Sequence, residues 1–157
     1  VSYDGIGEIE TGLLAVGKGP SLDVFHKGSR YPDSLGLLYS AVTHYLGWRH
    51  HCDEGIIMGL ACYGDAQLAV PGDGRSYIEV FREIVRETGD YDYEIGRDWI
   101  VYHEVRDKWV SDQFCEVFGK KRGRDDDLTG HHKHIAAALQ LRLEEIVLAQ
   151  LQKAQKQ

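Results

Sequence analysis

The clearest candidate for chemistry lies near the start of the sequence, in the segment YDGIGEIET (Tyr3–Thr11). Asp4 is predicted to end a strand, and Gly5, Gly7 and Glu8 follow it in a turn. Glycines let backbone N–H groups approach a bound phosphate without a Cβ in the way, and a carboxylate at such a turn can hold a metal ion that bridges phosphates. A simple hairpin turn, in which the aspartate bonds its own backbone, explains the same residues. Both interpretations stay open on these residues alone.

A second candidate is the segment DEGIIMGLACYG (Asp53–Gly64). Asp53 is placed to cap a helix and Glu54 to favour its first turn, since negative charge stabilises a helix N-terminus. The short apolar run that follows predicts a helix that buries Ile57 and Leu60 and stops at glycine. On composition alone, a short helix docked on the core is favoured over a loop that holds a ligand.

Histidines and cysteines raise the question of zinc. The segment RHHC (Arg49–Cys52) with Cys62, and the segment HHKH with His131 and His134 on one helical face, contain zinc-ligand residue types. Neither has the spacing of a structural zinc site with four ligands. Surface or helix-start histidines are therefore the favoured interpretation, and the positive end of the helix dipole disfavours protonation of His131 and His134.

These residues must be positioned by a mixture of strands and helices. The first part of the chain predicts an antiparallel meander, with apolar strand segments at residues 13–16 and 22–25 separated by the turn at Lys18–Pro20. Residues 34–46 predict a helix with Ser34 as its N-cap and Gly47 as its stop.

Further helices are predicted in the second half of the chain. Ser76 and Glu79 form a capping-box pattern, and an amphipathic segment runs through Phe118. A last helix begins near His131 and carries an apolar stripe, formed by Ile135, Leu139, Leu143, Ile146, Val147 and Leu151. Residues 90–96 and 99–105 are predicted to pair as short strands. The class is α/β or α+β, in a single region spanning residues 1–157 with no repeat.

Composition limits the possible partners. The formal net charge is −7, which argues against binding to nucleic acid or to an anionic membrane. No apolar run approaches the roughly 20 residues that span a bilayer, and no signal peptide is visible. The three cysteines stand at unrelated spacings, which fits reduced thiols and a cytoplasmic location better than a disulfide framework.

Four segments, taken in order, resemble one protein family: DGIGE with its following threonine, YPDSLGLLYSAVTHYLGW, DEGIIMGLACYG and HIAAALQLRLEE. The family is that of the carbamoyltransferases that modify nodulation factors and aminoglycoside or cephalosporin antibiotics. The resemblance runs from Tyr3 to about Glu145. The two central segments are long and specific to it.

The resemblance implies a fold and a reaction. It implies that residues 1–157 are the middle of an N-terminal adenylating domain with the actin-like (RNase H-like) kinase fold shared with threonylcarbamoyl enzymes, and that a smaller second domain follows. The implied reaction makes carbamoyl adenylate from ATP and carbamoyl phosphate with release of pyrophosphate. The carbamoyl group then passes to a hydroxyl of an oligosaccharide or antibiotic acceptor.

The resemblance also assigns expected sites. Asp4 matches an aspartate that ligates a divalent metal, iron or magnesium, and Gly5, Gly7 and Glu8 would border the phosphates. In the segment DEGIIMGLACYG, Asp53, Glu54 and Gly59 are expected near the nucleotide. The family's metal-binding histidines and second aspartate fall outside residues 1–157, so the chain would hold one of roughly four ligands, and a single ligand makes no tight site.

Two departures from the family pattern stand out. Ile56 occupies a position where the family usually has lysine, and His134 one where it usually has an acid. An altered member that kept the fold but lost catalysis, acting as a nucleotide-binding or scaffolding module, is therefore the alternative function. The isolated chain is predicted to be inactive and to expose apolar surface through which copies can associate.

Overall fold

The computed structural model describes residues 1–89 and 91–156. Their mixture of strands and helices confirms the predicted α+β class. The strands are β1 (Ser2–Tyr3), β2 (Gly12–Lys18), β3 (Ser21–Lys27), β4 (Val85–Glu87) and β5 (Tyr93–Ile95). The helices are α1 (Leu35–Tyr45), α2 (Glu54–Ala61), α3 (Tyr77–Ile84), α4 (Asp112–Phe118) and α5 (Gly130–Ala154).

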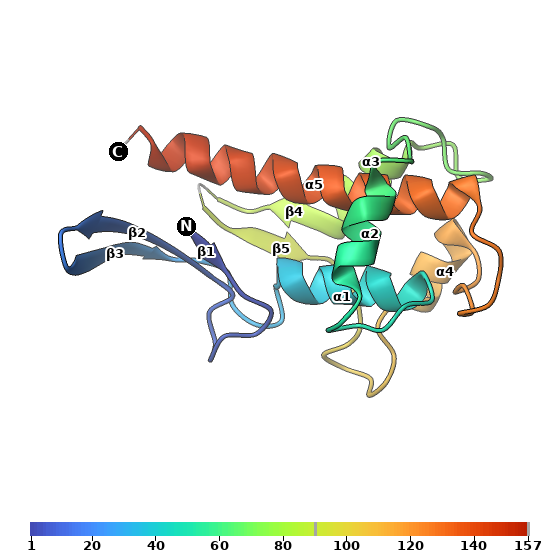
Figure 1. Cartoon of the computed structure of the whole chain (residues 1–157), viewed down its shortest axis with the longest axis horizontal. Helices are drawn as coiled ribbons and strands as arrows, with labels where there is room; N and C mark the ends of the chain where they lie inside the picture. Colours follow the sequence, from blue (N-terminus) through green and yellow to red (C-terminus); the bar gives the residue numbers. More distant parts are fainter. Residues whose placement is uncertain (90, 157) are drawn as a thin grey trace.

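The predicted meander is confirmed as an antiparallel sheet in the order β1-β2-β3. The far half of its β2–β3 hairpin projects from the helical body (Figure 1). Leu22, Val24 and Phe25 of β3 are exposed by 64%, 42% and 40%. The hairpin thus presents apolar side chains that a stable sheet normally covers.

The helix predicted at residues 34–46 is confirmed as α1. The side chain of its N-cap, Ser34, accepts a hydrogen bond from the Leu37 N–H at 3.1 Å. The helix ends where Gly47 adopts φ +91°, a conformation that favours glycine. Local capping chemistry therefore fixes both ends of α1.

The capping box at Ser76 and Glu79 is also confirmed at the start of α3. The predicted pairing of residues 90–96 with residues 99–105 is wrong, and residue 90 of that prediction lies outside the described residues. The partner of β5 is β4, which continues directly from the end of α3, with Val85 opposite Ile95. Residues 99–105 form a loop held by an isolated bridge between Ile100 and Val110. The apolar residues at the start of this loop, Trp99 and Ile100, are buried in the core. They do not pair with β5, because β4 is the partner of β5.

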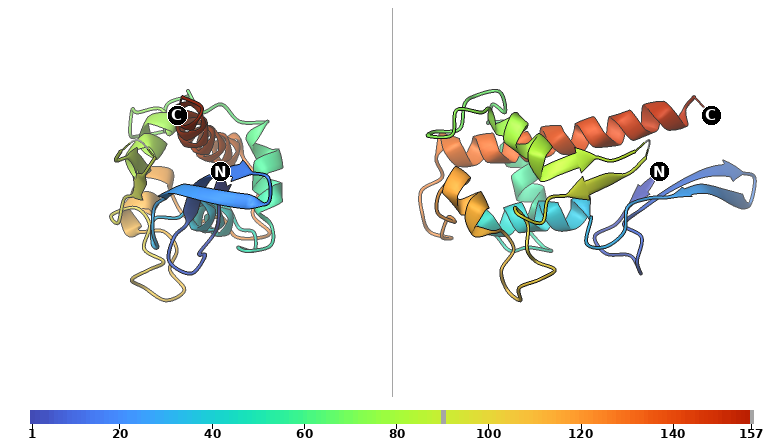
Figure 2. Two further views of the ribbon diagram at one scale, coloured as in Figure 1. Left: turned by 90° about the vertical axis from the view of Figure 1, so that its left-hand side faces the viewer. Right: turned by 180° about the vertical axis from the view of Figure 1, so that it is seen from behind.

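Helix α5 runs along the helical body and packs against α2 and α3, with further contacts to α1 (Figures 1 and 2). Ile135, Leu139 and Ile146 of its predicted stripe are buried. The prediction that Leu151 points inward is wrong, because this residue is 41% exposed near the end of the helix. Ile57 and Leu60 of α2 are buried as predicted.

Candidate functional site

The turn at residues 4–8 follows β1, and its first residue keeps part of a carboxylate free. Asp4 Oδ1 accepts a hydrogen bond from the Gly5 N–H at 2.6 Å, and the Asp4 N–H donates to the Thr11 carbonyl at 3.0 Å. Within the described residues, Asp4 Oδ2 has no hydrogen-bond partner. The side chain therefore fixes its own turn with one oxygen and offers the other to solvent. We call residues 4–8 the Asp4 turn.

The glycines of the Asp4 turn differ in how strictly they are required. Gly7 has φ +55°, and a Cβ at this position would lie 2.4 Å from the Glu10 carbonyl oxygen. Gly5 has open space around its own Cβ position. Across the part of the chain that the structure describes, the N–H groups of Ile6, Gly7 and Glu8 donate to no protein acceptor. Consecutive unpaired N–H groups of this kind form concavities that bind anions. The side chain of Glu8 is exposed and makes no described contact.

The N-terminus of α1 holds the Asp4 turn in place. The hydroxyl of Ser34 lies 2.5 Å from the Gly5 carbonyl oxygen and 3.2 Å from that of Asp4, and it donates toward both. A Cβ on Gly36 would lie 2.9 Å from Gly5 Cα, so only glycine permits this approach. Ser34 and Gly36 thus seat the turn directly on the first residues of the helix.

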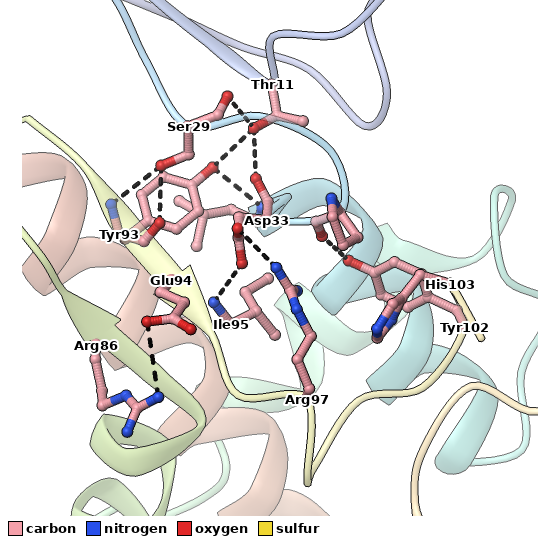
Figure 3. Close-up of polar contacts among 12 residues, drawn as sticks. Thr11, Ser29, Asp33, Arg86, Tyr93, Glu94, Ile95, Arg97, Tyr102 and His103 are labelled. Carbon is pink, nitrogen blue, oxygen red and sulfur yellow. Dashed lines mark hydrogen bonds and ion pairs between the residues drawn. The ribbon is translucent and has the colours of Figure 1, made fainter.

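A buried polar network ties this arrangement to β5 (Figure 3). Thr11 Oγ1 lies 2.8 Å from the Ser29 carbonyl oxygen and 2.5 Å from that of Asp33. The Asp33 carboxylate accepts from the Ile95 N–H at 2.7 Å and from Arg97 at 2.8 Å. Hydrogen bonds therefore join the meander, the residues that precede α1, and β5, close to the Asp4 turn.

The carboxylates at the start of α2 accept hydrogen bonds from other groups of the chain. Asp53 is the N-cap residue, as predicted, but its side chain makes no capping bond to the helix. Instead, Asp53 Oδ2 accepts from the Arg49 N–H at 2.9 Å. Glu54 Oε1 accepts from the Ser40 hydroxyl and from the His51 N–H, each at 2.5 Å. These bonds close the loop between α1 and α2.

The charge of Glu54 is stabilised by those bonds. Burial acts to raise the pKa of its carboxyl, but hydrogen bonds from Ser40 and from backbone N–H groups outweigh burial and lower the pKa. Glu54 is thus an ionised side chain fixed by a buried hydroxyl, an arrangement that suits a structural role.

One face of α1 brings the two predicted site segments together. Gly36 contacts the Asp4 turn, and Ser40 contacts Glu54. Residues four apart in a helix lie on the same face and about 6 Å apart along the axis. The structure therefore places both segments on neighbouring positions of one helix.

Gly59 and Ile56 lie apart from these contacts. A Cβ on Gly59 would meet nothing within 4 Å, so no neighbour in the described chain requires glycine there. Ile56, where the family resemblance leads one to expect lysine, is 48% exposed. Together with the exposed Met58 and Tyr63, these residues form the open side of α2.

A ring-lined pocket next to the Asp4 turn was not predicted as a site. It has a volume of about 270 Å³ and includes Ile6 of the turn and Leu37 of α1 in its wall. Its rings come from separate segments of the chain and belong to Tyr31, His50, His51, Tyr102 and Trp109. We call this feature the ring pocket. The sequence carries no local signal for it, because the rings are brought together only by the fold.

Two imidazoles at the ring pocket, those of His44 and His50, have lowered pKa values. Lys121 donates to Nε2 of His44 at 2.7 Å, and burial, together with Lys121 and His50, lowers the pKa of His44 to about 4. Burial and the neighbouring His51 also lower the pKa of His50. Both imidazoles are therefore uncharged at neutral pH.

No zinc site emerges. Within residues 1–89 and 91–156, no group of three or more histidine, cysteine or acidic side chains is placed to hold a metal ion. Cys52 and Cys62 are both exposed thiols. His131 contacts the Phe118 carbonyl at 2.7 Å, and His134 Nδ1 accepts from the Asp65 N–H at 2.9 Å. The preference for structural histidines at the start of α5 is consistent with these contacts.

The described residues form an α+β fold in which the Asp4 turn, with its unpaired N–H groups, lies beside the ring pocket. The whole chain, residues 1–157, matches the family model described as the carbamoyltransferase N-terminus. The chain therefore belongs to the carbamoyltransferase family.

Three curated proteins are similar to the chain, and two of them are nodulation proteins. The chain is 35% identical over 151 residues to the nodulation protein NolNO of Sinorhizobium fredii, covering 94% of the chain and 18% of the relative. It is 32% identical over 148 residues to the nodulation protein NolO of Bradyrhizobium diazoefficiens, covering 93% and 23%. An uncharacterized protein of Synechocystis is 31% identical over 147 residues, covering 92% and 22%. The chain thus spans about a fifth of the length of these relatives.

The helices also bear on whether a segment could cross a membrane. Among the helices described, none combines the length and the apolar character that crossing a bilayer requires.

Proposed function

We propose that this chain contributes part of an O-carbamoyltransferase, which forms carbamoyl adenylate from ATP and carbamoyl phosphate. The carbamoyl group would then pass to a hydroxyl of a sugar-containing acceptor. Family membership supports carbamoyl transfer in general. The observation that carries the finer proposal is the Asp4 turn, where unpaired N–H groups stand beside a free carboxylate oxygen.

The Asp4 turn would act on phosphate oxygens. The N–H groups of Ile6, Gly7 and Glu8 have no protein acceptor within the described residues, and successive free N–H groups in a turn can bind one anion. Gly7 is required for this backbone path, since any Cβ would collide with the Glu10 carbonyl. Within this proposal the turn binds and orients a phosphate group.

The described residues do not form a metal site by themselves. Asp4 supplies a single carboxylate oxygen, and no cluster of three ligand side chains exists within the described ranges. An iron or magnesium ion would need ligands from outside this chain, as the family resemblance implies. We therefore derive no step through a metal and assign Asp4 the role of one ligand.

The residues at the start of α2 would stabilise the structure around the site. Asp53 and Glu54 hold the loop that precedes the helix, and Glu54 is fixed to Ser40 on the same face of α1 as the Asp4 turn. Gly59 stands on the open side of α2, where a nucleotide can approach the backbone. We propose that Gly59 borders the nucleotide and that both carboxylates position the segment.

A second candidate function rests on Ile56. The exposed isoleucine stands at the position of a usual lysine and brings no charge for a phosphate. In this alternative, the protein keeps the fold as a nucleotide-binding or scaffolding module. Conversion of Ile56→Lys would then raise carbamoyl transfer from a negligible level.

The experiment uses the complete protein that contains this segment and, separately, the 157-residue chain. With ATP, carbamoyl phosphate, a divalent metal and a sugar panel, the complete protein is expected to release pyrophosphate and carbamoylate a hydroxyl. The isolated chain is expected to release none. Nucleotide binding without turnover by the complete protein would favour the module, and turnover by the isolated chain would contradict the assignment of missing ligands.

A further inference from the structure

The hydroxyl of Ser34 makes three contacts where the Asp4 turn meets α1. It accepts from the Leu37 N–H at 3.1 Å, and it donates toward the carbonyl oxygens of Gly5 at 2.5 Å and Asp4 at 3.2 Å. Ser34 is fully buried, so water has no access to this hydroxyl. A helix N-cap requires only the bond from Leu37. The two carbonyl contacts therefore concern the turn and not the helix.

These carbonyl contacts set the direction of two peptide planes. The peptide bonds that join Asp4 to Gly5 and Gly5 to Ile6 are trans, and the C=O and N–H groups of a trans peptide point in opposite directions. Because both carbonyls are held toward Ser34, the N–H groups of Gly5 and Ile6 point away from it. The Gly5 N–H donates to Asp4 Oδ1 at 2.6 Å, whereas the Ile6 N–H has no protein acceptor within the described residues. One hydroxyl thus orients both the Asp4 carboxylate and the first free donor of the turn.

Ser34 is itself held in place by the buried network shown in Figure 3. The preceding residue, Asp33, accepts through its carboxylate from the Ile95 N–H at 2.7 Å and from Arg97 at 2.8 Å. Its carbonyl accepts from Thr11 Oγ1 at 2.5 Å. These bonds fix the backbone before Ser34, and α1 fixes the backbone after it. Ser34 is therefore a rigid anchor, which accurate positioning of a functional group requires.

Close packing limits movement of the turn in the other direction. A Cβ on Gly36 would lie 2.9 Å from Gly5 Cα and 3.4 Å from the Asp4 carbonyl oxygen. The backbone of α1 therefore blocks movement of the turn toward the helix. The Ser34 hydroxyl opposes movement away from it, because both carbonyl contacts would lengthen. The position of the turn is thus set from both directions.

A second serine N-cap shows the same capping bond without the anchor. Ser111, at the start of α4, accepts from the Phe114 N–H at 3.1 Å, which equals the distance between Ser34 and the Leu37 N–H. Across the described residues, the Ser111 hydroxyl donates to no carbonyl. Ser111 is therefore a matched control for the capping role of Ser34.

We propose that Ser34 is a positioning residue, whose hydroxyl holds the Asp4 carboxylate and the Ile6 N–H in the orientation that binds phosphate. The inference rests on the proposed function for the identity of the bound group. Removal of a side chain that orients a ligating group typically lowers affinity or activity by about 10- to 100-fold. The effect is expected on the phosphate-bearing substrates, because they are the ones assigned to the turn.

The first test is the steady-state kinetics of Ser34→Ala in the complete protein. This variant is expected to lower kcat/KM for ATP or carbamoyl phosphate by about 10- to 100-fold, with a raised KM for that substrate and an unchanged KM for the sugar acceptor. Partial unfolding alone would lower kcat and leave every KM unchanged, because it only reduces the number of active molecules. Unchanged KM values for both phosphate substrates would overturn the proposal.

Three further variants separate the anchor from the helix cap. Ser34→Thr keeps a hydroxyl and is expected to restore the KM. Ser34→Gly removes the hydroxyl but places a residue that N-caps tolerate, so it is expected to raise the KM with a smaller loss of stability than Ser34→Ala. Ser111→Ala is expected to lower the unfolding temperature and to leave every KM unchanged. A raised KM in Ser111→Ala, or a normal one in Ser34→Gly, would contradict the assignment.

A measurement on the 157-residue chain separates failure of this inference from failure of the proposed function. The ¹⁵N–{¹H} nuclear Overhauser effect reports the order of the Gly5, Ile6 and Gly7 amides. Ser34→Ala and Ser34→Gly are expected to lower this order, and Ser111→Ala to leave it unchanged. If the order falls but the complete wild-type protein shows no carbamoyl transfer, Ser34 stands as the anchor of the turn and the proposed function fails. If transfer is active and the order does not depend on Ser34, the positioning role alone is wrong.

Discussion

The Asp4 turn and the start of α2 are both acidic segments seated on α1, yet they use their carboxylates differently. Asp4 binds its own backbone with one oxygen and leaves the other free. Asp53 Oδ2 accepts from the Arg49 N–H, and Glu54 Oε1 accepts both from Ser40 of α1 and from the His51 N–H. An acidic residue near a turn is therefore not by itself evidence for a ligand. Each of the three carboxylates uses one oxygen, so the difference lies in the partners: Asp4 bonds the next residue of its own turn, whereas Asp53 and Glu54 hold the loop before α2, and Glu54 ties it to α1.

The largest expected difference concerns the glycines of the two regions. Gly7→Ala is expected to lower the free energy of unfolding by about 2–3 kcal/mol, since it combines a positive φ with a collision against the Glu10 carbonyl. Gly59→Ala, in an open helical position, is expected to raise it by about 0.5–1 kcal/mol. Urea denaturation of the chain measures both, and equal effects would remove the distinction.

The carboxylates give a somewhat smaller contrast. Glu54→Ala leaves the buried Ser40 hydroxyl without its acceptor and is expected to cost about 1–2 kcal/mol of unfolding free energy. Asp4→Ala, at an exposed turn, is expected to change it by less than about 0.5 kcal/mol. Because the pKa of Glu54 is lowered in the folded chain, its contribution is present above the unfolded pKa and is lost as the pH falls below about 4.5. A larger loss for Asp4→Ala would reverse the assignment of roles.

His44, near the end of α1, predicts a dependence of stability on pH. The folded pKa of His44 is about 4, whereas an unfolded histidine titrates near 6.5. Between these values the unfolded chain binds more protons, so stability is expected to fall as the pH drops from about 6.5 to about 4. His44→Gln is expected to flatten this part of the profile in thermal unfolding scans. An unchanged slope in the variant would assign the effect to other groups.

The smallest expected effect is at Ile56. Ile56→Lys exchanges one exposed side chain for another and is expected to change the unfolding free energy by less than about 0.5 kcal/mol. A stability loss above about 1 kcal/mol would show that the open side of α2 is packed against something in the folded chain. The same variant in the complete protein separates the enzyme from the module.

Local chemistry explains what the sequence predicted well. The Ser34 cap, the Ser76–Glu79 capping box and the stop at Gly47 depend on residues within a few positions of one another. The antiparallel meander likewise depends on short turns. Such features are readable because both partners of each interaction stand in one short segment.

Long-range pairing explains what was missed. The partner of β5 is the three-residue continuation of α3, which carries no separate strand pattern, so residues 99–105 were paired wrongly. The ring pocket joins Tyr31 to Trp109 across much of the chain. The shared turn of Asp4, Gly5 and Gly7 is predicted from the sequence, but the bond between Ser40 of α1 and Glu54 is not, because its partners come from separate segments. The actin-like fold and the location of ligands stay predictions.

The most direct test compares Asp4→Asn with Asp53→Asn in the complete protein, with carbamoyl transfer and unfolding measured on the same preparations. The account predicts that Asp4→Asn lowers transfer by about 100-fold or more with unchanged stability, because a ligand oxygen is lost. Asp53→Asn is expected to lower transfer by less than about threefold, because an amide oxygen still accepts from the Arg49 N–H. Normal transfer by Asp4→Asn, or equal losses in both variants, would contradict the assignment of the Asp4 turn as the ligand-binding region.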